Sequence, residues 1–122
     1  MLSYNKNIKK KSVNYNLIST PNVELLNYLI QQKKYAQAQD IALRIINIFP
    51  NDEETLTKLA FVLYELKNFK NALLIINKIL ELKPKKLSIL RNKALIYEKL
   101  LNYEKAIKIY NNCLNLQFHN IS

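Results

Sequence analysis

Apolar residues recur at helical spacing through most of this chain. In the segment "FKNALLIINKILELKP" (residues 69–84) they follow one another at intervals of three and four, and the run ends at a proline. This spacing is typical of one face of an α-helix, which a proline then ends. Related segments are "YAQAQDIALRIINIFP" (35–50) and "YEKAIKIYNNCLNLQF" (103–118), and each is preceded by a second apolar-striped stretch and a short polar turn. The pattern therefore predicts pairs of helices throughout.

The three segments repeat at a fixed offset. Tyr35, Phe69 and Tyr103 are 34 positions apart, and so are the residues of four further sets. These sets are Ala38, Ala72 and Ala106; Pro50 and Pro84; Ile46, Leu80 and Leu114; and Ile48, Leu82 and Leu116. A period of this length indicates a helical hairpin repeat. Because two helices cannot bury their own apolar faces, we expect neighbouring repeats to stack.

The N-terminal stretch lacks this pattern. Residues 1–18 contain four lysines, no acidic residue and no sustained periodicity, so we interpret them as a mobile basic arm. A localisation or organelle-targeting signal and a contact arm for an acidic partner are the alternative interpretations. Order is predicted to begin at "STPNVELLNYLI", where Thr20 can cap a helix and Pro21 suits its first position.

The composition excludes several kinds of chemistry. The chain has no glycine, which phosphate-binding loops, dinucleotide fingerprints and nucleophile elbows require. One cysteine and one histidine cannot form an internal disulfide or a zinc site. Asp40, Glu65 and Glu98 are single carboxylates on solvated helix faces, Cys113 is predicted to be a buried structural thiol, and His119 is given no role. We therefore expect no enzyme, no cofactor and no metal.

The charge and hydropathy bear on partners and location. The net charge is +10, and seventeen of the nineteen basic residues are lysine. Codon bias of an AT-rich genome explains such a composition, and attraction to nucleic acid or anionic lipid is the alternative. No apolar run approaches the length of a membrane span, and no secretory signal is evident. We expect a soluble intracellular chain, in the cytoplasm or in an organelle stroma such as that of a plastid.

With repeats starting at Ser19, Glu53 and Leu87, the chain resembles three consecutive tetratricopeptide repeats. The family's small eighth position holds Leu26, Ala60 and Ala94, the aromatic that begins the second helix is present three times, and the closing proline is present twice. The resemblance implies an all-α fold of three stacked antiparallel helix–turn–helix hairpins in a short right-handed solenoid. It divides the chain into repeats at 19–52, 53–86 and 87–118, after the arm and before a C-terminal tail at 119–122.

The sequence departs from the family pattern at several positions. Leu26 is large where a small residue is usual, so we expect the first repeat to pack loosely. Lys33, Lys67 and Leu101 occupy the turn position that usually holds glycine, and Phe118 replaces the third closing proline. No solvating helix follows the third repeat. We therefore expect apolar residues such as Tyr110 and Leu114 to be partly exposed, and self-association or a docked partner to cover them.

The resemblance also implies a function. The first helices of successive repeats line a concave groove in this family, which suggests a non-enzymatic adaptor, assembly factor or chaperone-like factor that binds a protein or peptide. Phe61 and Tyr64, one turn apart, would form an aromatic centre between Ile30 and Leu95 for an apolar or amphipathic segment. The alternative is that Phe61 and Leu95 only pack between helices. By position, the groove would present Val23, Asn27, Ile30, Thr57, Lys58, Phe61, Tyr64, Arg91, Asn92, Leu95 and Glu98.

Three more specific functions can be weighed on the sequence. Tetratricopeptide domains that clamp the C-terminal carboxylate of chaperones use lysine, asparagine and arginine at positions that here read Val23, Asn27, Lys58, Ser88 and Asn92; only Asn27 matches, which speaks against that role. RNA binding is an alternative, but the basic residues do not recur at one repeat position. Small plastid tetratricopeptide proteins that assist photosystem assembly have a similar composition and repeat count, so this is a further alternative. A bacterial secretion chaperone or a fragment-like adaptor from a reduced genome is an alternative of equal standing.

Overall fold

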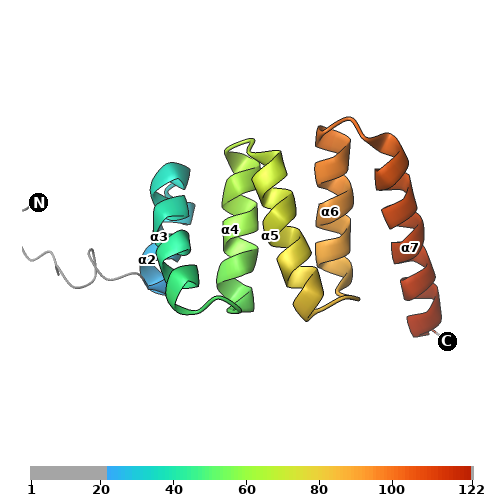
Figure 1. Ribbon diagram of the computed structural model, residues 1–122, viewed down its shortest axis with the longest axis horizontal. Helices are drawn as coiled ribbons and strands as arrows, with labels where there is room; N and C mark the ends of the chain where they lie inside the picture. The colour runs from blue at the N-terminus through green and yellow to red at the C-terminus, as the bar shows by residue number, and fades with distance from the viewer. Residues whose placement is uncertain (1–21, 122) are drawn as a thin grey trace, which may run out of the picture.

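The computed structural model describes residues 22–121 of the chain, with side chains as far as Phe118. The described residues form helices and no strand, and each helix packs against the next along the chain. Figure 1 shows a row that runs from α2 and α3, which overlap in this view, to α7 at the other end. The predicted basic arm at 1–18 lies outside the described residues. The helices are α2 (Val23–Gln31), α3 (Tyr35–Ile48), α4 (Glu53–Glu65), α5 (Phe69–Leu82), α6 (Leu87–Lys99) and α7 (Tyr103–Ile121).

The first helix begins later than the sequence suggested. Asn22 is its N-cap, and the side-chain oxygen of Asn22 accepts a hydrogen bond of 2.7 Å from the backbone N–H of Leu25. The prediction that Thr20 caps this helix is therefore wrong, and Thr20 and Pro21 lie outside the described residues. Asparagine satisfies a free amide at a helix start as well as threonine does, so the local sequence offered two competing caps.

The turn inside each hairpin has the same geometry. Lys33, Lys67 and Leu101 adopt left-handed backbone conformations, with φ of 59°, 62° and 63°. In the central turn the N–H of Lys67 donates to the carbonyl of Tyr64, and that of Asn68 donates to the carbonyl of Leu63. The same pair of bonds closes the other two turns. This is the Schellman arrangement, which satisfies the last carbonyls of a helix and usually places glycine at the left-handed residue.

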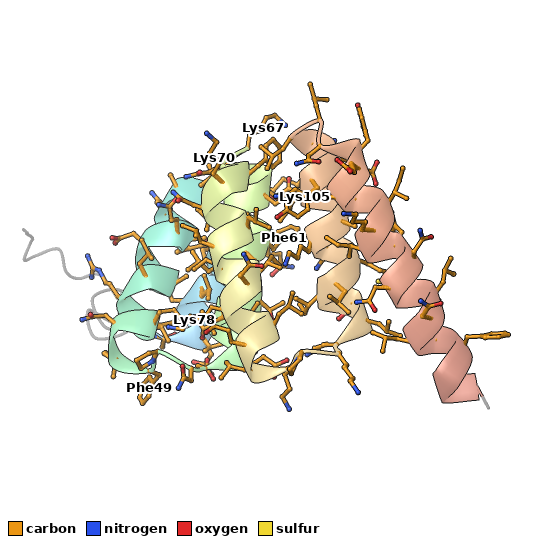
Figure 2. The ribbon with its side chains drawn as sticks, turned by 45° about the vertical axis from the view of Figure 1, so that its right-hand side comes forward. Phe49, Phe61, Lys67, Lys70, Lys78 and Lys105 are labelled. Atoms are coloured by element: carbon orange, nitrogen blue, oxygen red, sulfur yellow. The ribbon has the colours of Figure 1, made fainter. Side chains whose placement is uncertain are left out.

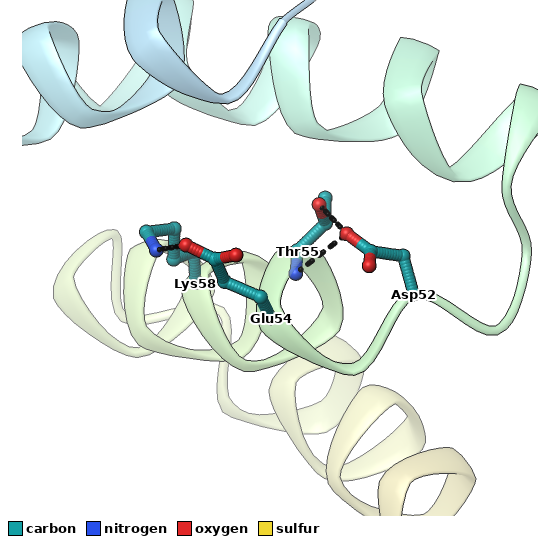
Figure 3. Close-up of polar contacts among 4 residues, drawn as sticks. All are labelled: Asp52, Glu54, Thr55 and Lys58. Carbon is teal, nitrogen blue, oxygen red and sulfur yellow. Dashed lines mark hydrogen bonds and ion pairs between the residues drawn. The ribbon is translucent and has the colours of Figure 1, made fainter.

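The junctions between hairpins are shaped by proline and by caps. Pro50 and Pro84 follow α3 and α5 and prevent those helices from continuing. Asp52 then caps α4: its carboxylate accepts a hydrogen bond of 3.3 Å from the backbone N–H of Thr55 and a second one from the Thr55 hydroxyl (Figure 3). Since no proline follows α7, this helix runs through the tail expected at 119–122 as far as Ile121.

The core lies along the contacts between successive helices. Ala38, Ala72 and Ala106, at the small position of each second helix, are buried. Leu26 is also fully buried, so the loose packing expected around it is not found. Its extra volume is offset by Ala42, which is fully buried in α3 where the later repeats carry the larger Ile76 and Tyr110.

A surface ion pair joins two hairpins. The ammonium group of Lys86, just before α6, donates to the carboxylate of Glu53 at the start of α4, and this bond holds the pKa of Glu53 below its ordinary value. Within single helices Asp40 pairs with Arg44, and Glu54 with Lys58. Exposed pairs of this kind contribute little to stability, so the stack depends on apolar packing.

Candidate functional site

A pocket opens between the first helices of the second and third hairpins. It has a volume of about 350 Å³ and lies between α4 and α6, with Ile76 of α5 reaching its floor. Ala60, Ile76 and Ile96 are buried and form an apolar base. The complete lining is Thr57, Ala60, Phe61, Tyr64, Glu65, Ile76, Asn92, Leu95 and Ile96.

Two apolar side chains stand exposed at this pocket. Phe61 is 44% exposed and Leu95 is 39% exposed, although both line the pocket over a buried floor. Figure 2 shows Phe61 near the middle of the molecule, in the space between the second and third hairpins. Phe61 also packs against Tyr35 of α3, in line with the alternative interpretation. The exposed part of both side chains leaves apolar surface available to a second molecule.

The aromatic residues of the site are held by neighbours. The ring of Phe61 meets the ring of Tyr35 edge-on, with centroids 6.1 Å apart. The ring of Tyr64 meets that of Phe69 in the same way at 5.4 Å. Tyr35 and Phe69 are the aromatic residues that begin the second helices, so the repeat pattern itself supplies these supports. Edge-to-face pairs add to apolar burial and fix the orientation of the rings.

The structure brings together only part of the predicted groove. Thr57, Phe61, Tyr64, Asn92 and Leu95 line the pocket. They come from two helices and occupy corresponding turns of them, as the 34-residue period requires. A groove made of these residues remains a prediction.

The other predicted groove residues lie elsewhere. Val23 lines a separate hollow near Phe49 and Pro50, where the first hairpin meets the second, and Ile30 packs against the core. Asn27 and Arg91 are exposed outside the pocket. The Lys58 ammonium pairs with Glu54 at 2.7 Å, as Figure 3 shows.

Glu98, the last predicted groove residue, is engaged with the final helix. The hydroxyl of Tyr110 donates a hydrogen bond to its carboxylate, and this bond, together with burial, raises the pKa of Tyr110 to about 12. Tyr110 is partly exposed, as the sequence predicted. Glu98 is therefore a structural partner of α7 and not a free acidic group of the pocket.

Sequence reasoning missed some pocket residues. Glu65 and the floor residues Ala60, Ile76 and Ile96 were not predicted to contribute. Ile76 lies on α5, the second helix of its hairpin. Its position in the repeat could have identified it, because that position reaches between α4 and α6. Glu65 directly follows Tyr64 and brings the only charge in the lining.

The pocket lining is mostly apolar and contains no lysine, arginine, histidine or cysteine. Among residues 22–121 no group of three or more histidine, cysteine, aspartate or glutamate side chains is placed to hold a metal ion. Cys113 is buried, as predicted. Within the same residues, no helix has both the length and the apolar character that a membrane crossing needs.

Comparison with known proteins agrees with this architecture. Residues 31–113 match a family model described as anaphase-promoting complex, cyclosome, subunit 3. No curated protein matches the chain. Among solved structures, MamA MSR-1 has a TM-score of 0.74 at 19% identity, covering 86% of this chain and 63% of its own. MamA from Desulfovibrio magneticus RS-1 has a TM-score of 0.74 at 13% identity, with 80% and 55% covered.

A third structure contains a bound peptide. The first TPR of Spaghetti (RPAP3), bound to the HSP90 peptide SRMEEVD, has a TM-score of 0.69 at 25% identity, covering 76% of this chain and 74% of its own. The chain spans 54% of the length of another similar structure, MamA AMB-1, so it corresponds to part of the MamA chains. The stack of helical hairpins is the feature that all these proteins share.

Proposed function

Because the chain belongs to the family described as anaphase-promoting complex, cyclosome, subunit 3, a family of tetratricopeptide-like repeats, we propose that it is a non-enzymatic adaptor or assembly factor. It binds an apolar or amphipathic segment of a partner protein in the pocket between α4 and α6. The observation that carries this proposal is the pair of exposed side chains, Phe61 and Leu95, beside a buried apolar floor.

The pocket has the chemistry to hold one large apolar side chain. Burying a leucine- or phenylalanine-sized group contributes about 1.5–3 kcal/mol. Phe61 is already oriented by Tyr35, so little ordering opposes binding. Thr57 and Asn92 supply the polar groups that would fix the register of a bound segment.

The charge of the pocket argues for a partner that is not acidic. The RPAP3 domain binds the peptide SRMEEVD, which carries two glutamates and an aspartate. Here Glu65 is the only charged residue in the lining, and the nearby Lys58 is already paired with Glu54. An acidic tail would be repelled by Glu65 and would find no free cation in the lining.

The same charge bears on the two alternative functions. RNA binding would place phosphates near basic side chains, and the lining contains none. A role in plastid photosystem assembly is one process that such an adaptor could serve, and it rests on composition alone. An apolar or amphipathic protein segment is therefore the occupant with most support.

Peptide selection followed by calorimetry tests the proposal. Peptides are selected against the 122-residue chain from a random display library, and their dissociation constants are measured by isothermal titration. Phe61→Ala and Leu95→Glu should each raise the dissociation constant at least about tenfold, because both remove apolar contact from the pocket. Leu74→Glu is the matched control, since Leu74 is a 65% exposed leucine on α5 outside the lining.

The selected sequences provide a second readout. They should be rich in leucine, isoleucine and aromatic residues and poor in acidic ones, and their binding should change little with salt. Selection of acidic peptides, or equal affinity for the wild type and Leu95→Glu, would refute the assignment to this pocket. Helicity measured by circular dichroism should be unchanged in all three variants, because the replaced side chains are exposed.

A further inference from the structure

Helix α7 carries a line of exposed apolar side chains. Tyr103, Ile107, Leu114 and Phe118 are 57%, 58%, 62% and 77% exposed. Their spacing of four, seven and four residues places them on one side of a helix. We call these four residues the α7 stripe. Figure 1 shows α7 at the end of the row, with α6 as its neighbour on one side.

At the equivalent positions of the second repeat, the side chains pack against neighbouring helices. Leu73 and Leu80 of α5 correspond to Ile107 and Leu114, 34 residues later. Both α5 residues are partly buried and pack against the core, with α6 following α5 in the row. In the described part of the chain, no helix occupies the corresponding place beside α7. The stripe is therefore a packing face that these residues leave open.

We propose that the α7 stripe pairs with the α7 stripe of a second copy of this chain, in antiparallel orientation about a twofold axis. The spacing of the stripe reads the same in both directions. Antiparallel pairing about a point between Tyr110 and Asn111 places Ile107 opposite Leu114 and Tyr103 opposite Phe118, and each contact occurs twice. A surface that is complementary to itself under a twofold rotation is what a symmetric dimer requires.

The charges along α7 also fit this pairing. In the antiparallel register Glu104 lies level with Gln117, Lys105 with Leu116, and Lys108 with Cys113. No two like charges therefore meet at one level. Neutral Asn111 and Asn115 flank the stripe, and the helix carries one glutamate and two lysines, so its small net charge offers little to a strongly charged partner. A second copy of α7 places no like charge at the same level, and its pairing does not depend on a strongly charged surface.

The dimension of the stripe sets the expected affinity. From Tyr103 to Phe118 it is about 22 Å long, at 1.5 Å per residue. An interface of one helix per partner lies at the low end of specific protein contacts, so we expect a dissociation constant of about 1–100 µM. Each chain has a net charge of +10, so long-range repulsion should weaken association at low salt and screening should strengthen it.

Sedimentation equilibrium of the 122-residue chain tests the pairing. The wild type should associate to a dimer within this concentration range, and more strongly at high salt. Ile107→Glu and Leu114→Lys should each raise the dissociation constant at least about tenfold, because each places a charge against an apolar side chain. Leu74→Lys is the control, since Leu74 is as exposed as Leu114 but lies on α5, and it should leave the dimer intact.

Mixing the two α7 variants tests the orientation. In the antiparallel pair the introduced carboxylate at 107 meets the introduced ammonium at 114 of the other chain, while Leu114 and Ile107 still pack at the second site. The mixture should therefore form a mixed dimer more tightly than either variant forms its own. A monomeric wild type at about 100 µM would overturn the proposal. So would a dimer that Leu114→Lys leaves unchanged, or a mixture that associates no better than its components.

This test is independent of the proposed function. The stripe lies on α7, whereas the pocket lies between α4 and α6 and is lined by no residue of α7. Leu114→Lys should leave the affinity for a selected peptide unchanged, and Leu95→Glu should leave the dimer unchanged. Failure of one proposal thus leaves the measurement of the other intact.

Discussion

Lys33, Lys67 and Leu101 adopt a backbone conformation that costs free energy for any residue with a Cβ atom. Their φ values lie near +60°, where the Cβ atom approaches the following carbonyl. The family uses glycine at this position, and the sequence contains none. The paired Schellman hydrogen bonds hold the geometry despite this cost. The identity of the residue at each turn was evident from the sequence, but the conformation was not, since another turn type could have accommodated a lysine.

Replacing Lys67 with glycine should therefore stabilise the chain. Lys67→Gly relieves the left-handed strain and should raise the free energy of unfolding by about 0.5–1 kcal/mol, after the entropy cost of glycine in the unfolded chain. Urea denaturation monitored by circular dichroism measures the change. Lys108→Gly, in the middle of α7, is the control and should cost about 1 kcal/mol. Equal destabilisation by both changes would contradict the role given to the turn.

Tyr110 should titrate at a higher pH than an ordinary tyrosine. Its hydroxyl donates to the Glu98 carboxylate, which raises the pKa of Tyr110 to about 12 from an ordinary value of 10.0. Because the folded pKa is raised, the stability from this pair is fully present below pH 10 and is lost as the pH rises through about 12. Absorbance titration should therefore show a tyrosine ionisation step near pH 12.

Two variants assign that late step. Tyr110→Phe should remove it, and Glu98→Gln should move it towards the ordinary tyrosine range, because a neutral acceptor no longer disfavours the phenolate. Tyr97→Phe is a suitable control on the same hairpin and should leave the late step in place. A titration that is identical in wild type and Glu98→Gln would show that the pair does not form.

At the scale of the helix, close approach within each hairpin depends on small residues. Ala72 is fully buried where α5 packs against α4. Ala72→Arg would introduce both excess volume and an unpaired charge, so it should reduce the free energy of unfolding by at least about 3 kcal/mol and lower the melting temperature sharply. Leu74→Arg, two residues further on the exposed face, should have little effect. An unchanged melting temperature in Ala72→Arg would contradict the repeat alignment.

The helices themselves were the most predictable part of the structure. Sequence spacing identified both helices of every hairpin, because buried faces at a period of 34 residues leave a regular apolar pattern. The ends were less predictable. Asn22 replaced Thr20 as the first cap, since adjacent polar residues compete for that role. Helix α7 passed the expected end at Phe118, because no proline stops it there.

At the scale of the whole molecule, the stacking geometry decides which residues become neighbours. The repeat pattern placed Phe61 and Leu95 at corresponding positions of two first helices, and both line the pocket. It did not separate Val23 from them, and the structure places Val23 in a different hollow beside Phe49. Which residues become neighbours depends on how each hairpin is shifted and rotated against the next. The repeat period of the sequence does not give that shift or rotation.

The buried Cys113 is an intrinsic probe for opening of the last hairpin. It is the only cysteine, and it lies on the inner face of the last helix, where a thiol reagent cannot reach it until α7 separates from its neighbour. The rate of alkylation of Cys113 therefore reports on the opening of the terminal hairpin. No label needs to be engineered for this measurement. If a second copy docks on α7, the alkylation rate should fall as the protein concentration rises.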